Sequence, residues 1–200
     1  MEQEIPESLK VVRERAIDRP KYRGVLHAYC FFLSIPVGVT LIITSPSPRT
    51  SFAAAAFAFG ISSMLGISAL FHRTKFSDHD WMRFRRLDHI GIYLCIAGGY
   101  TPIGMLAVSG WVQKTLLITA WAGVAIGVII RFLPFDPPYG LMNALFLSMG
   151  WVAIVAIPQL SDFLDLTWLI LLAIGGALYT TGAFVAVSYT HLTLPTMFEV

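Results

Sequence analysis

Residues 52–73 read FAAAAFAFGISSMLGISALFHR, and this stretch decides what kind of protein the chain can form. The run from Phe52 to Phe71 carries no charge, and its length is close to the ~20 apolar residues that a helix needs to cross a bilayer. The run then ends in His72 and Arg73. Ser68 and His72 lie four residues apart, so on a helix they share one face, one turn apart. We therefore expect a membrane-spanning helix with a polar end.

The composition of the whole chain also indicates a membrane protein. Of its 200 residues, 56% are hydrophobic and 13% are charged, whereas a soluble domain carries roughly 25% charged residues. A water-facing globule of this size could not bury so much apolar surface. Cys30 and Cys95 lie inside apolar runs, so we expect small buried hydrophobic residues rather than a disulfide or a zinc cluster. The predicted fold class is an all-α, polytopic membrane helix bundle, with the lipid bilayer as its surroundings and no nucleic-acid partner.

Six apolar runs have the length of a membrane span, and breakers such as the Ser45–Arg49 turn separate them. We expect one domain, the helix bundle of residues 25–187, between an N-terminal segment (1–24) and a polar tail (188–200) that is too short for a seventh span. The first run lacks the layout of a cleaved signal peptide, so we expect it to be retained. The predicted spans are residues 25–44, 52–71, 88–108, 114–132, 141–157 and 166–187.

The positive charges predict the orientation of these spans. Lys and Arg residues near the spans favour the cytoplasmic side, and they concentrate before the first run and in the segment 73–87, which we expect to be a basic loop. The first two predicted spans separate these two basic segments, so both segments lie on the same side of the membrane. A cytoplasmic N-terminus therefore puts both of them on the cytoplasmic side, as the rule requires. The segment 159–165 carries Asp162 and Asp165 and no Lys or Arg, as an outer loop does. We expect a multi-pass protein of the plasma membrane.

Three polar groups meet the apolar runs at one predicted depth. Asp88 opens the third span, sixteen residues after His72, so a hydroxyl, an imidazole and a carboxylate lie on two consecutive helices. Ionisable groups in membrane spans mark function by default. A neutral imidazole suits zinc, and a catalytic zinc site has three protein ligands and a water, whose pKa the metal lowers to about 7. His72 is then a metal ligand, Asp88 holds or deprotonates the water, and Ser68 binds the water or a substrate oxygen.

Each of these residues also has a structural interpretation. Asp88 could be the N-cap of its helix, paired with Arg85 or Arg86. Ser68 could bond to its own helix backbone. His72 could be an ordinary histidine at a helix end.

The other histidines predict no complete metal site. His89 follows Asp88 directly, so it points about 100° away on a helix, and we expect it around the site or at the interface. His27 lies at the depth of His72, as a polar neighbour of the site or an interfacial residue. His79 falls in the basic loop and His191 in the tail. The sequence thus supplies one good histidine ligand, and it lacks H-E-x-x-H, C-x-x-C and G-x-S-x-G motifs.

Several motifs together resemble the hemolysin III family, which belongs with the progestin and adipoQ receptors and is related to alkaline ceramidases. The resemblance runs from about Arg19 to Ala186. The motifs are Ser68-x3-His72-Arg73, Arg85-Arg86-Leu87-Asp88-His89, Ala97-Gly98-Gly99-Tyr100-Thr101-Pro102, Asn143 through Gly150-Trp151, and Gly175 through Ala183.

The resemblance implies a seven-helix bundle with zinc near the cytoplasmic side. It makes His72 one zinc ligand, places Asp88 on the zinc-bound water and Ser68 beside it, and takes two more ligands from an H-x3-H motif on span seven. The implied activity is a zinc-dependent membrane hydrolase acting on a lipid amide such as a ceramide-like substrate. The alternative is a non-enzymatic membrane protein, either pore-forming (cytolytic) or receptor-like.

The chain departs from the family at its end. It contains neither a seventh span nor an H-x3-H motif. The residues from Val187 to Thr196 do not resemble the family; they are similar to the translation of a sequencing adapter. We therefore expect a chain truncated before the seventh span, with a non-native tail, rather than a genuine six-span variant. One histidine without partner ligands makes no tetrahedral site, so we expect poor zinc binding by this chain alone.

Overall fold

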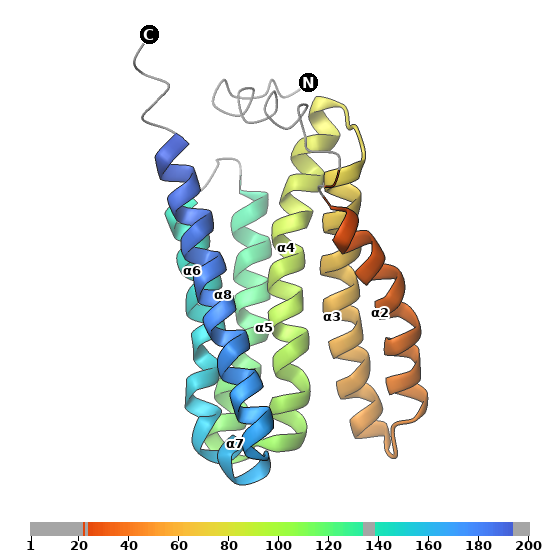
Figure 1. Cartoon of the computed structure of the whole chain (residues 1–200), viewed down its shortest axis with the longest axis vertical. Coiled ribbons are helices and arrows are strands. Elements are labelled where there is room, and N and C mark those ends of the chain that lie inside the picture. The colour runs from red at the N-terminus through yellow and green to blue at the C-terminus, as the bar shows by residue number, and fades with distance from the viewer. Residues whose placement is uncertain (1–21, 23, 134–138, 194–200) are drawn as a thin grey trace. The chain divides into compact units, whose positions relative to one another are not determined.

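The computed structural model describes residues 22, 24–133 and 139–193, and every regular element among them is helical (Figure 1). The chain divides into two units, residues 1–99 and 100–200. Helix α4 (Asp78–Pro102) crosses from the first unit into the second. The prediction of an all-α fold is confirmed for the described residues.

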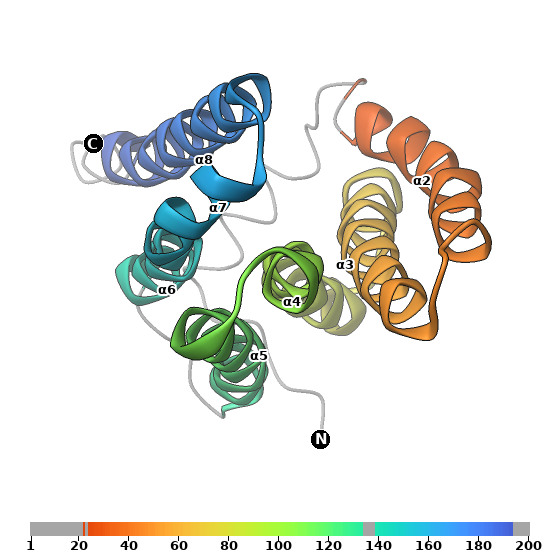
Figure 2. The same cartoon turned by 90° about the horizontal axis from the view of Figure 1, so that it is seen from below.

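In the first unit, α2 (Val25–Ile43) and α3 (Pro48–Arg73) form an antiparallel hairpin, and they lie side by side in both Figure 1 and Figure 2. A capping box starts α3. The Ser47 hydroxyl accepts a hydrogen bond from the Thr50 backbone N–H (3.3 Å), and the Thr50 hydroxyl accepts one from the Ser47 N–H (3.0 Å). Pro48 is the first helical residue, where its missing N–H costs nothing. The turn 44–47 therefore ends one span and begins the next.

Small residues line the contact between α2 and α3. A Cβ placed on Gly38 would lie 2.7 Å from the Cβ of Ala58, and one placed on Gly66 would lie 2.8 Å from the Phe31 ring. The Ser34 and Ser62 hydroxyls share a hydrogen bond of 2.8 Å between the helices. Close backbone approach and interhelical hydrogen bonds are the forces that hold membrane helices together, because lipid offers no hydrophobic drive for their association.

The backbones of α3 and α4 come closer still. A Cβ on Gly98 would lie 2.7 Å from the Ala56 carbonyl oxygen and 3.0 Å from the Gly60 Cα, and a Cβ on Gly91 would lie 3.1 Å from the Met64 Cα. These pairs define an antiparallel register, in which residue numbers rise along α3 as the residue numbers of their partners on α4 fall. The glycines thus let two backbones touch without side chains between them.

Helix α4 begins ten residues before the predicted third span. Ser77 caps it: its hydroxyl accepts from the Asp80 N–H (3.3 Å) and donates to the Asp80 carboxylate (2.9 Å). The segment from Asp78 to Asp88 contains neither Gly nor Pro, so nothing interrupts the helix where the hydropathy changes. The expectation of a basic loop over residues 73–87 is therefore wrong for most of its length, and only residues 74–77 lie outside the helices.

The second unit contains a short π-helix and five further helical elements, with their bounds as follows: η1 (Ile103–Ala107), α5 (Gly110–Phe132), α6 (Tyr139–Trp151), η2 (Val152–Ala156), α7 (Ile157–Phe163) and α8 (Leu166–Thr193). Helix α5 packs against η1, η2 and α6, and α8 packs against α6 and α7.

The predicted outer loop at 159–165 is mostly helical. Gln159 on α7 accepts from the Ser109 N–H (2.8 Å) and its amide donates to the Ser109 carbonyl (3.5 Å), which ties α7 to the start of α5.

A tyrosine hydroxyl interrupts the helix that contains α6. The Tyr100 hydroxyl lies 2.9 Å from the Met149 carbonyl oxygen and 3.2 Å from the Ala153 N–H, and it also donates to the Gly150 carbonyl. In a regular α-helix the Ala153 N–H would bond to the Met149 carbonyl directly. The inserted hydroxyl therefore accounts for the change from α6 to the 3-10 helix η2.

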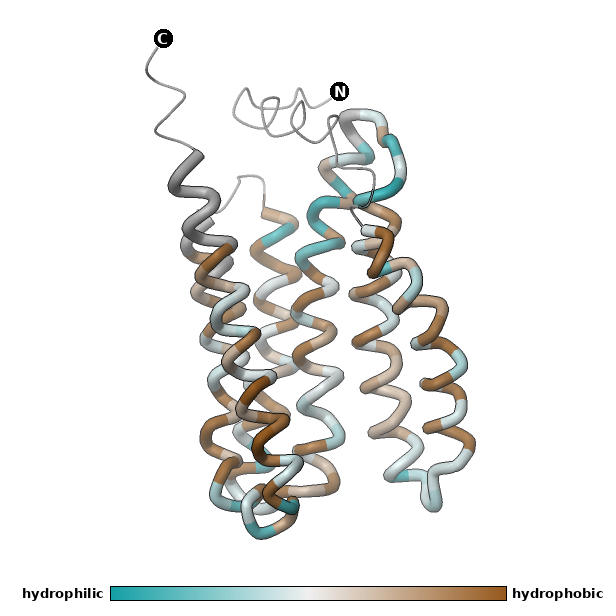
Figure 3. Tube along the Cα trace, viewed as in Figure 1, coloured by the Kyte–Doolittle hydropathy of each residue, from teal (hydrophilic) through white to brown (hydrophobic). Residues whose placement is uncertain are grey.

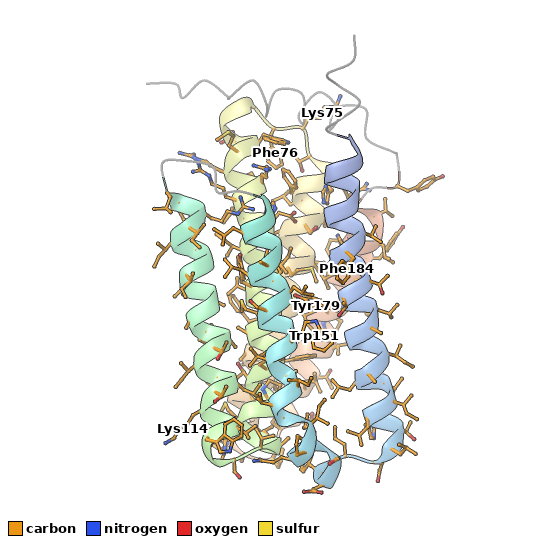
Figure 4. All side chains as sticks on the ribbon, turned by 90° about the vertical axis from the view of Figure 1, so that its left-hand side faces the viewer. Lys75, Phe76, Lys114, Trp151, Tyr179 and Phe184 are labelled. Atoms are coloured by element: carbon orange, nitrogen blue, oxygen red, sulfur yellow. The ribbon has the colours of Figure 1, made fainter. Side chains whose placement is uncertain are left out.

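Helix α8 braces the same region of α6. The Tyr179 hydroxyl donates to the Phe146 carbonyl, and Figure 4 labels the Tyr179 side chain. A Cβ on Gly150 would lie 2.4 Å from the Tyr179 ring, so only glycine leaves room for this ring. Two tyrosines thus satisfy carbonyls of α6.

Six helical stretches among the described residues are long and apolar enough to cross a membrane. Their outward side chains are apolar: Phe32 is 72% exposed on α2 and Leu178 is 68% exposed on α8. Figure 3 shows apolar residues along the lengths of these helices and hydrophilic residues at the α3–α4 turn. Such surface is stable in hydrocarbon and not in water, so this is a multi-pass membrane protein.

Helix α8 continues to Thr193, beyond the predicted end of the sixth span at residue 187. The residues between these positions include neither Gly nor Pro, and the first breaker is Pro195. The first residues of the predicted polar tail are therefore helical, and residues 194–200 lie outside the described part of the chain.

The glycine contact between α3 and α4 predicts opposite outcomes at two adjacent positions. Gly98→Ala should destabilise the protein by about 1–3 kcal/mol, because its methyl group would meet the Ala56 carbonyl. Gly99→Ala is the matched control, since a Cβ there meets no described atom within 4 Å, and it should be neutral or stabilising by up to ~1 kcal/mol. Thermal unfolding in detergent measures both, and equal costs at the two positions would contradict the proposed contact.

The inserted Tyr100 hydroxyl predicts a local effect of its removal. Tyr100→Phe should cost about 1–3 kcal/mol, because the Ala153 N–H and the two carbonyls lose their shared partner. Amide hydrogen exchange should accelerate at Ala153 more than in α5. Tyr22→Phe, at a tyrosine 84% exposed, is the control and should change neither quantity. An unchanged exchange rate at Ala153 in Tyr100→Phe would sink the interpretation.

Candidate polar site

The packing register brings Ser68 and Asp88 to one level. The close pairs Ala56–Gly98 and Met64–Gly91 run antiparallel along α3 and α4. Continuing that register one more turn places Ser68 opposite the turn of α4 that contains Asp88. The expectation that Ser68, His72 and Asp88 share one depth stays a prediction, which this register supports for Ser68 and Asp88. Ser68 is 6% exposed and Asp88 is half-buried, so both lie among neighbouring side chains rather than in open solvent.

His72 lies one turn nearer the end of α3, against the beginning of α2. A Cβ placed on Gly24 would lie 2.7 Å from the His72 Cβ and 3.4 Å from the Arg73 Cγ. Gly24 also has a φ of 76°, in the left-handed region that favours glycine. The His72 ring lies 5.1 Å from the Phe71 ring. Gly24, the residue just before α2, therefore lies against His72, and a side chain at position 24 would displace it.

Asp88 lies inside α4, and the interpretation of Asp88 as an N-cap is wrong. The helix begins at Asp78, where Ser77 provides the cap. A carboxylate ten residues into the helix cannot satisfy the free N–H groups of its first turn. The structural alternative for Ser68, a bond to its own backbone, stays a prediction.

The remaining histidines take different positions. The His89 Nδ1 donates to the Arg85 carbonyl one turn earlier (2.7 Å), so its ring is held against its own helix. His27 lies level with Ala69 in the α2–α3 register, and its buried Nδ1 has no hydrogen-bond partner among the described residues. The side chains of His79 and His191 lie outside the described part of the structure.

The described residues do not form a zinc site. Among them, no group of three His, Cys, Asp or Glu side chains is arranged to hold a metal ion, whereas a catalytic zinc needs three protein ligands. The zinc that the family resemblance implies therefore does not fit the described residues by themselves.

Sequence reasoning missed the aromatic support beneath this site. Trp81 is 4% exposed, and its ring lies 6.0 Å from Phe71 on α3. The Arg85 guanidinium lies 5.7 Å from the centre of the Trp81 ring. The spacing of Trp81 and Arg85 is that of one helical turn, but the assumption of a loop at 73–87 concealed it. Gly24 was missed because its role depends on contact with another helix.

The family model described as "Haemolysin-III related" matches residues 15–191 of this chain. The chain belongs to the hemolysin III family. Two relatives of this family agree: Hemolysin-3 from Bacillus cereus is 37% identical over 164 residues, which cover 80% of this chain and 74% of the relative. A Hemolysin-3 homolog from Bacillus subtilis (strain 168) is 33% identical over 164 residues, covering 80% and 76%. No solved structure matches the chain. The hemolysin III match extends five residues past Ala186, where the sequence resemblance was expected to stop.

Proposed function

We propose that this hemolysin III protein is a zinc-dependent membrane hydrolase of lipid-amide type, with its site at Ser68, His72 and Asp88. The observation that carries the proposal is the register of α3 and α4, which brings a buried serine and a carboxylate to one level. His72 follows one turn away on the face of α3 that carries Ser68. Polar groups gathered at one end of otherwise apolar membrane helices are costly, and function is the usual reason for their presence.

The chemistry of these side chains suits hydrolysis. A carboxylate such as Asp88 can orient a water or take its proton, as a general base does. The Ser68 hydroxyl can donate a hydrogen bond to a substrate oxygen, and the imidazole of His72 can ligate zinc. Because the described residues form no group of three metal ligands, the further ligands would have to lie outside them. The roles proposed for Ser68 and Asp88 do not require these further ligands, because they depend only on where the two side chains lie on α3 and α4.

The substrate class follows from the membrane setting and the family resemblance. Ser68 and His72 lie near the end of α3, and Asp88 lies toward the start of α4, both helices being long and apolar enough to cross a membrane. A site near the ends of such helices would meet a lipid close to its headgroup linkage. An amide of a ceramide-like lipid would present its carbonyl near that level. We further propose a plasma-membrane location with a cytoplasmic N-terminus, supported by the basic residues at the α3–α4 turn.

The proposed ligand role of His72 predicts a loss of zinc. In the purified protein, His72→Ala should lower zinc affinity by more than the roughly 10–100-fold typical of residues that only support a ligand. Atomic absorption after dialysis against a weak chelator measures the metal bound per chain. His89→Ala is the matched control, because His89 turns one ring nitrogen onto its own backbone, and it should retain the metal. Unchanged zinc content in His72→Ala would refute the proposal.

A second candidate function rests on the relatives' printed names, which call them hemolysins. A pore-forming, cytolytic protein would release a dye from liposomes, whereas a hydrolase or a receptor-like bundle would not. We expect no leakage from wild-type protein, since the outward faces of its described helices are apolar and a conducting path needs polar residues at several depths. Dye release that persists in the variant with Ser68, His72 and Asp88 all changed to Ala would instead favour the pore.

A further inference from the structure

The turn between α3 and α4 carries basic side chains that no role above uses. We propose that they bind the phosphate of an anionic phospholipid in the surrounding membrane. The basic residues Arg73, Lys75, Arg83 and Arg86, here named the headgroup patch, come from the end of α3, the turn and the first turns of α4. The proposal is independent of the hydrolase and of zinc.

The charge of the headgroup patch is available to a ligand. Arg73 and Lys75 are exposed, and the Arg83 side chain is 63% exposed. Arg83 forms an ion pair with Asp80 at 3.9 Å, but Asp80 is itself 48% exposed. Surface pairs of this kind contribute little and exchange readily for a stronger anion. From residue 73 to residue 87 the chain has five basic and two acidic residues, so the segment carries an excess of positive charge.

Aromatic contacts hold the headgroup patch in place. The Phe76 ring of the turn stacks on Phe84 of α4, with ring centres 4.2 Å apart and an angle of 18°. Ser77 caps α4 directly after this stack. Figure 4 shows Lys75 and Phe76 together at this turn. A turn fixed before the ligand arrives loses little conformational freedom on binding, which favours a defined site.

The lengths of the helices place this patch at headgroup depth. Helix α4 has 25 residues, which is about 37 Å at 1.5 Å per residue. The hydrocarbon core of a bilayer is ~30 Å thick, and the headgroup regions bring this to ~40–45 Å. The first turns of α4 must therefore extend past the hydrocarbon. Figure 3 shows hydrophilic residues at this end of α4 and at the turn.

The patch fits a lipid better than a soluble anion because apolar surface continues below it. Leu70 is 46% exposed and lies one turn before Arg73, on the same side of α3. An acyl chain can lie along Leu70 while the phosphate reaches the charged residues above. Arginine presents two parallel N–H groups to phosphate oxygens, and several Lys or Arg residues beside a membrane span are the feature that recognises anionic lipids.

The test compares lipids as stabilising ligands of the purified chain in an uncharged maltoside detergent. Phosphatidylglycerol should raise the midpoint of thermal unfolding, and phosphatidylcholine should not, because a ligand that binds only the folded state stabilises it. In Arg73→Gln/Lys75→Gln/Arg83→Gln, the apparent affinity for phosphatidylglycerol should fall roughly fivefold for each charge removed. Arg49→Gln, at the opposite end of α3, is the matched control and should keep the full response.

Each other outcome overturns the proposal. Equal stabilisation by phosphatidylcholine would show that the acyl chains alone bind. An equal response to inorganic phosphate would assign the patch to a soluble anion. A triple variant that keeps the phosphatidylglycerol response would place that lipid elsewhere. Should the triple variant not fold, Lys75→Gln, at an exposed turn residue, must still weaken the response, and Arg73→Lys/Arg83→Lys must retain most of it.

Discussion

Close contact between the backbones of α3 and α4 is the constraint on which the polar site depends. In a bilayer, lipid tails are as apolar as the helices, so association relies on packing and on polar contacts. Gly60, Gly91 and Gly98 remove the side chains that would keep the two backbones apart. The resulting antiparallel register sets which turn of α4 faces each turn of α3. Ser68 and Asp88 share a level because of glycines that lie one to three turns deeper in the membrane.

Both ends of this arrangement are held by contacts with neighbouring segments. Gly24, the residue just before α2, lies against His72. Trp81 packs on Phe71, and the Arg85 guanidinium lies over the Trp81 ring. The polar residues therefore lie between the apolar stretches of α3 and α4 and the basic turn that joins these helices. This position suits the proposed hydrolysis of a lipid linkage and also the proposed binding of a lipid phosphate. Different residues would carry out these two tasks. The two proposals consequently use different side chains and fail independently.

The second unit shows how a membrane helix can bend without an unpaired backbone group. A freed carbonyl or N–H costs several kcal/mol in hydrocarbon unless another group satisfies it. The Tyr100 hydroxyl satisfies both sides of the break between α6 and η2, and the Tyr179 hydroxyl serves the Phe146 carbonyl. Gly150 leaves the room that the Tyr179 ring needs. Each tyrosine is polar only at its tip, so its apolar ring remains compatible with the interior.

The sequence by itself determined the all-α class, the six membrane-spanning stretches and the shared helical face of Ser68 and His72, because hydropathy and a 3.6-residue period are local properties. Hydropathy did not locate the start of α4. The helix begins at Asp78, where Ser77 caps it, ten residues before the apolar run begins. Asp88 is therefore not an N-cap. Only the tertiary structure decided the level of Asp88 relative to Ser68, the contact of Gly24 with His72 and the insertion of Tyr100. These depend on the register between helices, and register arises from contacts between residues far apart in the chain.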